Sequence, residues 1–166
     1  MIFKNRNLSL VNMHDLVSLR KSSESVAEYL AASSREAAAF STNAEKYELD
    51  RDITERLKDY VEGVVVFTFS AEWCPDCHRH IPVLGLIAEA TGLEVKVFGH
   101  LMRDPKRPKG YWAIPPSPAE VEEFNVRKIP TIVILDTEGN KIGEIIENPP
   151  EGKSLEEALL GILEEN

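Results

Sequence analysis

The chain has 166 residues, of which 43% are apolar, and its 19 basic and 28 acidic side chains give a formal net charge of −9. A chain of this length and composition is expected to form one globular unit with its own hydrophobic core. The isoelectric point near 5.0 argues against a general nucleic-acid-binding protein, because phosphate contacts need a surplus of lysine and arginine. We expect a monomer with no nucleic-acid partner.

Nothing in the sequence predicts export or insertion into a membrane. Polar side chains are scattered through residues 1–20, so this segment lacks the continuous apolar run that a signal peptide needs. The longest apolar run, at 64–69, is far shorter than the roughly 18 residues of a membrane span. The only two cysteines, Cys74 and Cys77, are typical of a reactive or metal-binding pair in a reducing compartment. We therefore expect a cytoplasmic protein with no membrane partner.

Two helices are predicted in the first part of the chain, at 24–41 and 51–61. Each begins with a polar residue followed three positions later by a glutamate, and Ser25 with Glu28 is the clearer case of this capping box. Apolar residues then recur at the spacing expected for the buried face of a helix. Residues 1–62 are therefore expected to form a helical N-terminal extension.

The rest of the chain, 63–166, alternates strand and helix patterns. Residues 64–69 are apolar at nearly every position, which is typical of a central strand buried on both faces. The other predicted elements, in chain order, are a helix at 75–90, a strand at 93–98, a short helix at 117–124 capped by Ser117, strands at 131–135 and 141–146, and a helix at 154–163. This order predicts an α/β fold with a central mixed sheet flanked by helices.

The two cysteines lie where the buried strand ends and the next helix begins. Pro75 suits the first turn of that helix, because a residue there needs no backbone N–H. A helix N-terminus presents unpaired N–H groups and the positive end of a dipole, and both favour a thiolate. We therefore expect Cys74 to be an exposed, acidic nucleophile and Cys77, one turn later, to react with its sulfur. The predicted chemistry is thiol–disulfide exchange.

Several motifs together resemble the thioredoxin superfamily. The segment Ala71-Glu72-Trp73-Cys74-x-x-Cys77 is similar to the active-site segment of that family, and Ile129-Pro130-Thr131 resembles its cis-proline loop. Pro82 falls five residues after the second cysteine, where thioredoxins kink the active-site helix. The resemblance covers about 63–163 and implies a thioredoxin-like fold.

The resemblance also implies a function and a set of site residues. It implies an enzyme, a protein-disulfide oxidoreductase, in which Cys74 and Cys77 are the catalytic pair. The partners would be disulfides of protein substrates and an external dithiol or reductase that supplies electrons. No organic cofactor and no metal is needed for this exchange. The residues expected to bind substrate lie beside the pair and in the proline loop, and they are Trp73, Pro75, Asp76, Ile129 and Pro130.

Two positions depart from the family pattern. Thioredoxins usually hold a buried aspartate six residues before the first cysteine, and this chain has Thr68 there, so the route of the buried proton is open. The two residues between the cysteines are Pro75 and Asp76, and the carboxylate should oppose formation of a thiolate. We expect this dipeptide to make the pair more reducing than a Pro-His site.

Other interpretations of the cysteines stay open. The chain could be a thioredoxin-fold module that binds a partner or senses redox state with little turnover. Cys74-x-x-Cys77-His78 also spells a c-type haem attachment site, although no export signal accompanies it. A zinc site could add His78 and His80, but these side chains diverge by about 200° on a helix.

One further segment stands out by its composition. Residues 103–118 are rich in proline and locally basic in an acidic chain. They are predicted to form a surface loop or an insertion that contacts a partner. Next to the basic residues, Tyr111 and Trp112 are expected either to pack within the loop or to extend the contact surface around Trp73.

Overall fold

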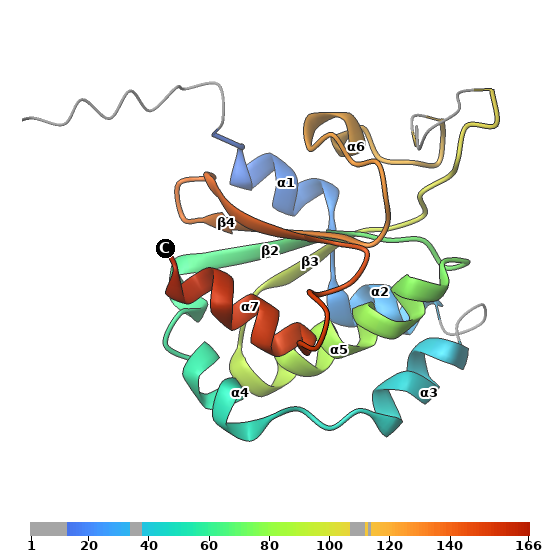
Figure 1. Cartoon of the computed structure of the whole chain (residues 1–166). Coiled ribbons are helices and arrows are strands. Elements are labelled where there is room, and N and C mark those ends of the chain that lie inside the picture. Colours follow the sequence, from blue (N-terminus) through green and yellow to red (C-terminus); the bar gives the residue numbers. More distant parts are fainter. Residues whose placement is uncertain (1–12, 34–37, 107–111, 113) are drawn as a thin grey trace, which may run out of the picture.

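The computed structural model describes residues 13–33, 38–106, 112 and 114–166. A five-stranded sheet runs through the middle of the molecule, with the strand order β1-β3-β2-β4-β5 (Figure 1). The central strand β2 pairs parallel with β3 and antiparallel with β4, so the sheet is mixed. The α/β fold expected from the sequence is confirmed. The strands are β1 (Glu24–Ser25), β2 (Val64–Phe69), β3 (Val95–Phe98), β4 (Thr131–Asp136) and β5 (Lys141–Ile146).

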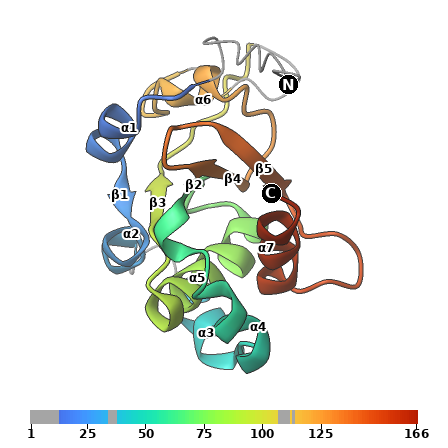
Figure 2. The ribbon, with the colours of Figure 1, turned by 90° about the vertical axis from the view of Figure 1, so that its left-hand side faces the viewer.

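Helices cover both faces of this sheet. In Figures 1 and 2, α5 and α7 lie on one face, with α3 and α4 packed outside them, while α1 and α6 lie on the other face. None of the helices in the described parts of the chain is long and apolar enough to cross a membrane. The helices are α1 (Leu16–Ser22), α2 (Val26–Ala32), α3 (Ala38–Lys46), α4 (Arg51–Leu57), α5 (Pro75–Thr91), α6 (Glu120–Glu123) and α7 (Leu155–Glu164).

Strand β2 lies at the centre of the hydrophobic core. Five of its six residues are buried, which explains why the sequence is apolar at successive positions. The rings of Phe67 and Phe69 stack on Phe98 of β3 at centroid distances of 5.8 and 5.0 Å. This packing fixes the end of β2, from which the chain passes directly to the cysteines.

The helix predicted at 24–41 is only partly correct. Glu24 and Ser25 are strand residues that pair with Val97 and Lys96 of β3. The capping box of Ser25 and Glu28 is present, but it starts a short helix, α2, that ends at Ala32. A two-residue edge strand leaves no periodic pattern, so the sequence does not distinguish it from the first turn of a helix.

Other elements also differ from the predictions, since α4 ends four residues before its predicted end and β3 begins two residues after its predicted start. Helix α1 was not predicted, because only Leu19 of its seven residues is buried and the apolar stripe is weak. Ser117 does not cap α6; instead, its hydroxyl bonds the backbone of Met102, and the helix begins at Glu120. Helices α5 and α7 and strands β4 and β5 lie within one residue of their predicted bounds.

The segment before residue 63 shares its core with the rest of the chain. Leu19, Tyr29, Phe40 and Leu57 are each at most 2% exposed and belong to the same hydrophobic cluster as the sheet. Helices α2 and α3 both pack on α5. The division of the chain at residue 62 stays a prediction about its organisation, which the substitution Phe40→Ala tests.

Candidate active site

The cysteine pair occupies the N-terminus of α5. Cys74 is the cap residue, with φ −84° and ψ 118°, and Pro75 takes the first helical position. The Sγ atom of Cys74 accepts a hydrogen bond of 3.2 Å from the backbone N–H of Cys77. The first turn of the helix therefore directs at this sulfur an N–H group that has no partner within the helix. This arrangement favours a thiolate.

The two thiols are more buried than the sequence predicts. Cys74 was expected to be exposed, but it is only 4% exposed, and Cys77 is 0% exposed. The cover comes from the loop before β4, because the Cys74 sulfur lies 3.6 Å from the carbonyl oxygen of Ile129. These residues are 55 positions apart in the chain, so a local sequence pattern gives no sign of this contact.

The environment shifts the pKa values of the two thiols in opposite directions. The pKa of Cys74 lies below its ordinary value, chiefly because the thiol of Cys77 donates a hydrogen bond to it, with further help from the N–H groups of Cys77 and Asp76. Burial raises the pKa of Cys77 well above its ordinary value, and the neighbouring Cys74 sulfur raises it further. Cys74 is therefore the thiol that ionises first, and Cys77 keeps its proton.

Asp76 acts on Cys74 in the predicted direction. Its negative charge raises the pKa of Cys74, but this is the smallest of the contributions. The Asp76 carboxylate is paired with Arg79 one turn along the helix, at 2.7 Å, so part of its charge is balanced. The hydrogen bonds from the helix start and from Cys77 therefore outweigh the carboxylate.

The proline loop lies directly beside the pair. The peptide bond between Ile129 and Pro130 is cis, and both residues are buried. The carbonyl oxygen of Pro130 accepts a 2.7 Å hydrogen bond from the N–H of Glu147, which follows β5. The structure thus brings Ile129, the residue before the cis proline, next to Cys74, while contact of Ile129 and Pro130 with a substrate stays a prediction.

An exposed aromatic side chain adjoins the cysteines. Trp73 is 52% exposed, and its indole N–H donates to the carbonyl oxygen of Leu101 at 3.2 Å. Its ring lies 5.9 Å from that of Trp112, which is only 6% exposed. Trp112 is therefore a buried packing partner of Trp73 and does not extend the exposed surface. Tyr111 lies outside the described residues.

The two histidines after Cys77 contact different parts of the chain. The imidazole of His78 bonds the backbone oxygen of Glu72 and packs edge-on against Phe40, at a centroid distance of 4.9 Å. The Nε2 atom of His80 lies 2.8 Å from the side-chain oxygen of Asn148. Among the described residues, no group of three or more His, Cys, Asp or Glu side chains is arranged to hold a metal ion.

Several residues that the fold brings near the cysteine pair have no functional role predicted from sequence. The Tyr29 hydroxyl of α2 lies 3.0 Å from Ser70 Oγ, just before the active-site segment. Asn43 of α3 donates a 2.7 Å hydrogen bond to the backbone oxygen of His78. Tyr29 and Phe40 lie in the helix predicted at 24–41, but an apolar periodicity does not show where a hydroxyl points. The N-terminal helices therefore contact the active-site end of α5.

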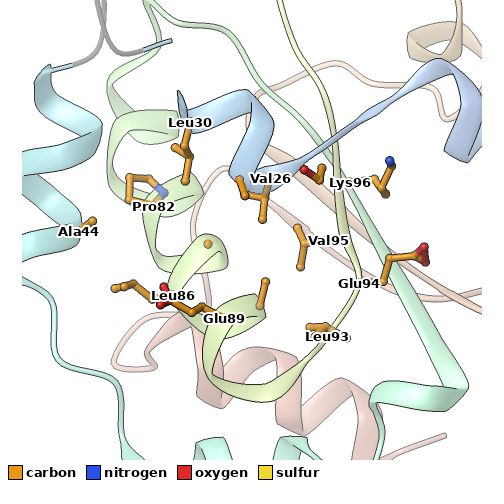
Figure 3. A pocket seen from close by; sticks show the side chains of 14 residues that line it. Val26, Leu30, Ala44, Pro82, Leu86, Glu89, Leu93, Glu94, Val95 and Lys96 are labelled. Carbon is orange, nitrogen blue, oxygen red and sulfur yellow. The ribbon is translucent and has the colours of Figure 1, made fainter. Parts of the chain in front are cut away.

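A separate cavity of about 720 Å³ lies between α2, α3, α5 and β3 (Figure 3). Its walls are mainly apolar, with Val26 and Leu30 on one side and Leu86 and Leu93 on another. Neither cysteine lines it. The cavity is thus distinct from the site built around the two thiols.

Comparison with known proteins agrees with this geometry. The family model described as thioredoxin matches residues 23–115, which is more than half of the chain. The chain belongs to the thioredoxin family. The match includes both cysteines of this thioredoxin-family protein but ends before Pro130. It also begins well before residue 63, so the family likeness extends further toward the N-terminus than the motifs suggested.

Two solved structures share the fold of this thioredoxin-family chain, and a third is similar to part of it. A protein of unknown function from Pseudomonas aeruginosa is 21% identical, with a TM-score of 0.61 over 92% of this chain and 99% of that one. An HIV epitope-scaffold is also 21% identical, with a TM-score of 0.62 over the same shares. A mutant thioredoxin from Halobacterium salinarum is 24% identical, with a TM-score of 0.41 over 71% of this chain and 85% of that one.

The comparisons support a redox role at a coarse level. The first two likenesses span 92% of this chain, so the shared fold includes helices that precede residue 63. No curated protein sequence matches the chain. Family membership and the spacing of Cys74 and Cys77 support redox chemistry.

Proposed function

We propose that this protein is a thiol–disulfide oxidoreductase that exchanges electrons with disulfides of proteins through Cys74 and Cys77. The observation that carries the proposal is the position of two free thiols at a helix N-terminus, where the backbone N–H of Cys77 donates to the Cys74 sulfur at 3.2 Å. The lowered pKa of Cys74 favours its thiolate as the attacking group, and the raised pKa of Cys77 keeps the second thiol protonated until the second step.

The exchange proceeds in two displacements. The Cys74 thiolate attacks one sulfur of the substrate disulfide, that bond breaks, and the departing substrate sulfur takes up a proton. Cys77 then loses its proton and attacks the Cys74 sulfur, which releases the second substrate thiol and leaves a Cys74–Cys77 disulfide. Two electrons pass to the substrate, and an external dithiol or reductase returns the pair to the reduced form.

The surroundings of Cys74 support a polypeptide substrate. Trp73 and Pro75 are exposed beside the sulfur and offer an apolar surface rather than a closed pocket. The carbonyl oxygen of Ile129, which accepts a 3.6 Å hydrogen bond from the Cys74 thiol, adds a polar group of the loop before β4. An extended substrate chain that crosses this surface would place its disulfide beside Cys74.

A second candidate function is a redox-sensing or binding module with little turnover. The observation in its favour is the burial of both thiols, which limits the access of a large substrate. Reduction of insulin by dithiothreitol separates the two functions. An oxidoreductase accelerates the reaction at catalytic concentration, whereas a sensing module titrates between its two redox states without accelerating it.

Trapping tests the proposed reaction with protein substrates. In Cys77→Ser, the second displacement is blocked, so we expect Cys74 to remain joined to a protein substrate by a disulfide that dithiothreitol cleaves. The measurement is non-reducing electrophoresis followed by mass spectrometry, with native insulin, whose disulfides are intact, as the substrate.

The double variant Cys74→Ser/Cys77→Ser is the matched control for trapping and should form no adduct. Absence of an adduct in Cys77→Ser, with the protein folded, would contradict exchange with protein disulfides.

A further inference from the structure

Another hollow, of about 360 Å³, lies along the active-site helix α5 and is separate from the cavity of Figure 3. Its walls are α3, α5 and the segment 149–155, which leads into α7. The volume is near the lower end of the roughly 300 to 1,000 Å³ that ligand sites enclose. The hollow therefore has room for a few side chains or a small ligand.

The charged side chains that line this hollow are all basic. Lys46, Arg79, His80 and Lys153 line it, and among the described residues no aspartate or glutamate does. Lys46 and Lys153 are exposed, and neither forms a salt bridge within the described parts of the chain. The chain as a whole has a net charge of −9, so this surface is locally opposite in sign. Such a surface attracts anions.

Hydrogen bonds between the walls form the hollow in the absence of a ligand. They join Asn43 of α3 to the backbone oxygen of His78 of α5 at 2.7 Å, Tyr47 of α3 to Glu156 of α7 at 2.7 Å, and His80 of α5 to the side-chain oxygen of Asn148 at 2.8 Å. Val83 and Leu155, both buried, supply apolar surface to the lining. A site formed in advance loses less conformational freedom when it binds.

The hollow adjoins the cysteine pair. Arg79 and His80 follow Cys77 by two and three residues, which is about 3 to 4.5 Å along the axis of α5. The segment that leads to the other wall is bonded to the proline loop, because the N–H of Glu147 donates to the carbonyl oxygen of Pro130 at 2.7 Å. A substrate chain that runs from the sulfur along the proline loop therefore reaches the hollow within a few residues.

The acidic groups of the walls leave this positive surface in place. Arg79 donates one N–H to Asp76 at 2.7 Å, and its guanidinium carries further N–H donors. Glu156 is 1% exposed and accepts hydrogen bonds from the Tyr47 hydroxyl and from the backbone N–H of Asp50. Neither carboxylate lines the hollow.

We propose that this hollow binds acidic side chains that lie next to the disulfide of the protein substrate, an inference that rests on the proposed function. The carboxylates of the substrate accept hydrogen bonds from Lys46 and Lys153, and Arg79 offers further donors. The protein then selects disulfides with acidic neighbours, although its net negative charge would otherwise repel them.

Two synthetic peptides with one internal disulfide test this selection. They differ only in the three residues on each side of the disulfide, which are all aspartate in one peptide and all asparagine in the other. Reduced protein is mixed with excess peptide, the reaction is stopped with N-ethylmaleimide, and the remaining protein thiols are counted by mass spectrometry. The measured quantity is the second-order rate constant of oxidation by each peptide.

We expect Lys46→Gln/Lys153→Gln to lower the rate constant for the acidic peptide about three- to tenfold, the strength of two exposed ion pairs. The rate constant for the neutral peptide should change by less than about twofold. The matched control is Lys58→Gln/Lys141→Gln, which removes two positive charges from exposed lysines that do not line the hollow. Both peptides should keep their rate constants in this control.

Three results would overturn the inference. They are no fall with the acidic peptide, an equal fall with both peptides, and an equal fall in the control variant. If neither peptide oxidises the wild-type protein, the proposed function is contradicted instead. Calorimetry with Cys74→Ser/Cys77→Ser then still tests the hollow, because binding of the acidic peptide needs no exchange. The lysine substitutions should weaken that binding about three- to tenfold, and unchanged binding overturns the inference.

Discussion

Replacing Cys74 by serine is expected to lower the rate of insulin reduction to that of dithiothreitol alone. The loss should be about 10³-fold or more, the order seen when a catalytic nucleophile is removed. The reason is that a serine hydroxyl does not ionise at neutral pH, even with the N–H groups of α5 directed at it. The measurement is turbidity from the precipitating insulin chains, at a catalytic concentration of protein.

The control for Cys74→Ser is a serine placed far from the site. Val17 is 74% exposed on α1, so Val17→Ser should keep full activity. If Cys74→Ser retained a substantial part of the activity, the first displacement would have to be assigned to another group.

Replacing Phe40 by alanine is expected to lower the free energy of unfolding by about 3 to 5 kcal/mol, the usual cost of truncating a buried phenylalanine. Phe40 is 2% exposed and contacts Tyr29 of α2 and His78 of α5. Loss of the ring leaves a cavity between the N-terminal helices and the active-site helix. The measurement is urea unfolding, followed by circular dichroism and by the fluorescence of Trp73 and Trp112.

The same experiment tests the division of the chain at residue 62. Both tryptophans lie after that residue, so a fall in their unfolding midpoint, coincident with the change in circular dichroism, would mean one cooperative unit. Val17→Ala is the control, since an exposed side chain should change stability by less than about 0.5 kcal/mol. A tryptophan midpoint that does not move in Phe40→Ala would instead support a separate N-terminal extension.

Local patterns predicted the elements whose signals are strong and continuous. The apolar run of β2, with Thr68 the polar exception, marks a strand that is buried on both faces. Ser154 and Glu157 form the capping box that starts α7, as expected. Cys74 and Pro75 occupy the cap and first position of α5, so the position of the cysteine pair also followed from sequence.

Features that depend on distant contacts did not follow from the sequence. Strand β1 exists because Glu24 and Ser25 pair with β3, and two residues are too few to show alternation. The burial of Cys74 depends on Ile129, which only the completed sheet brings near. The contact of Tyr29 with Ser70 likewise depends on how α2 packs beside β3.

The most direct test of the account is the pH dependence of alkylation of the reduced protein by iodoacetamide, with each thiol assigned by mass spectrometry. Only the thiolate reacts, so the rate at Cys74 rises with pH through its pKa. The hydrogen bond from Cys77 lowers that pKa, so the midpoint should lie below the value of about 8.5 for a free cysteine. Cys77→Ala removes the bond and should move the midpoint upward. A Cys74 midpoint at or above the free value, or labelling of Cys77 before Cys74, would contradict the account.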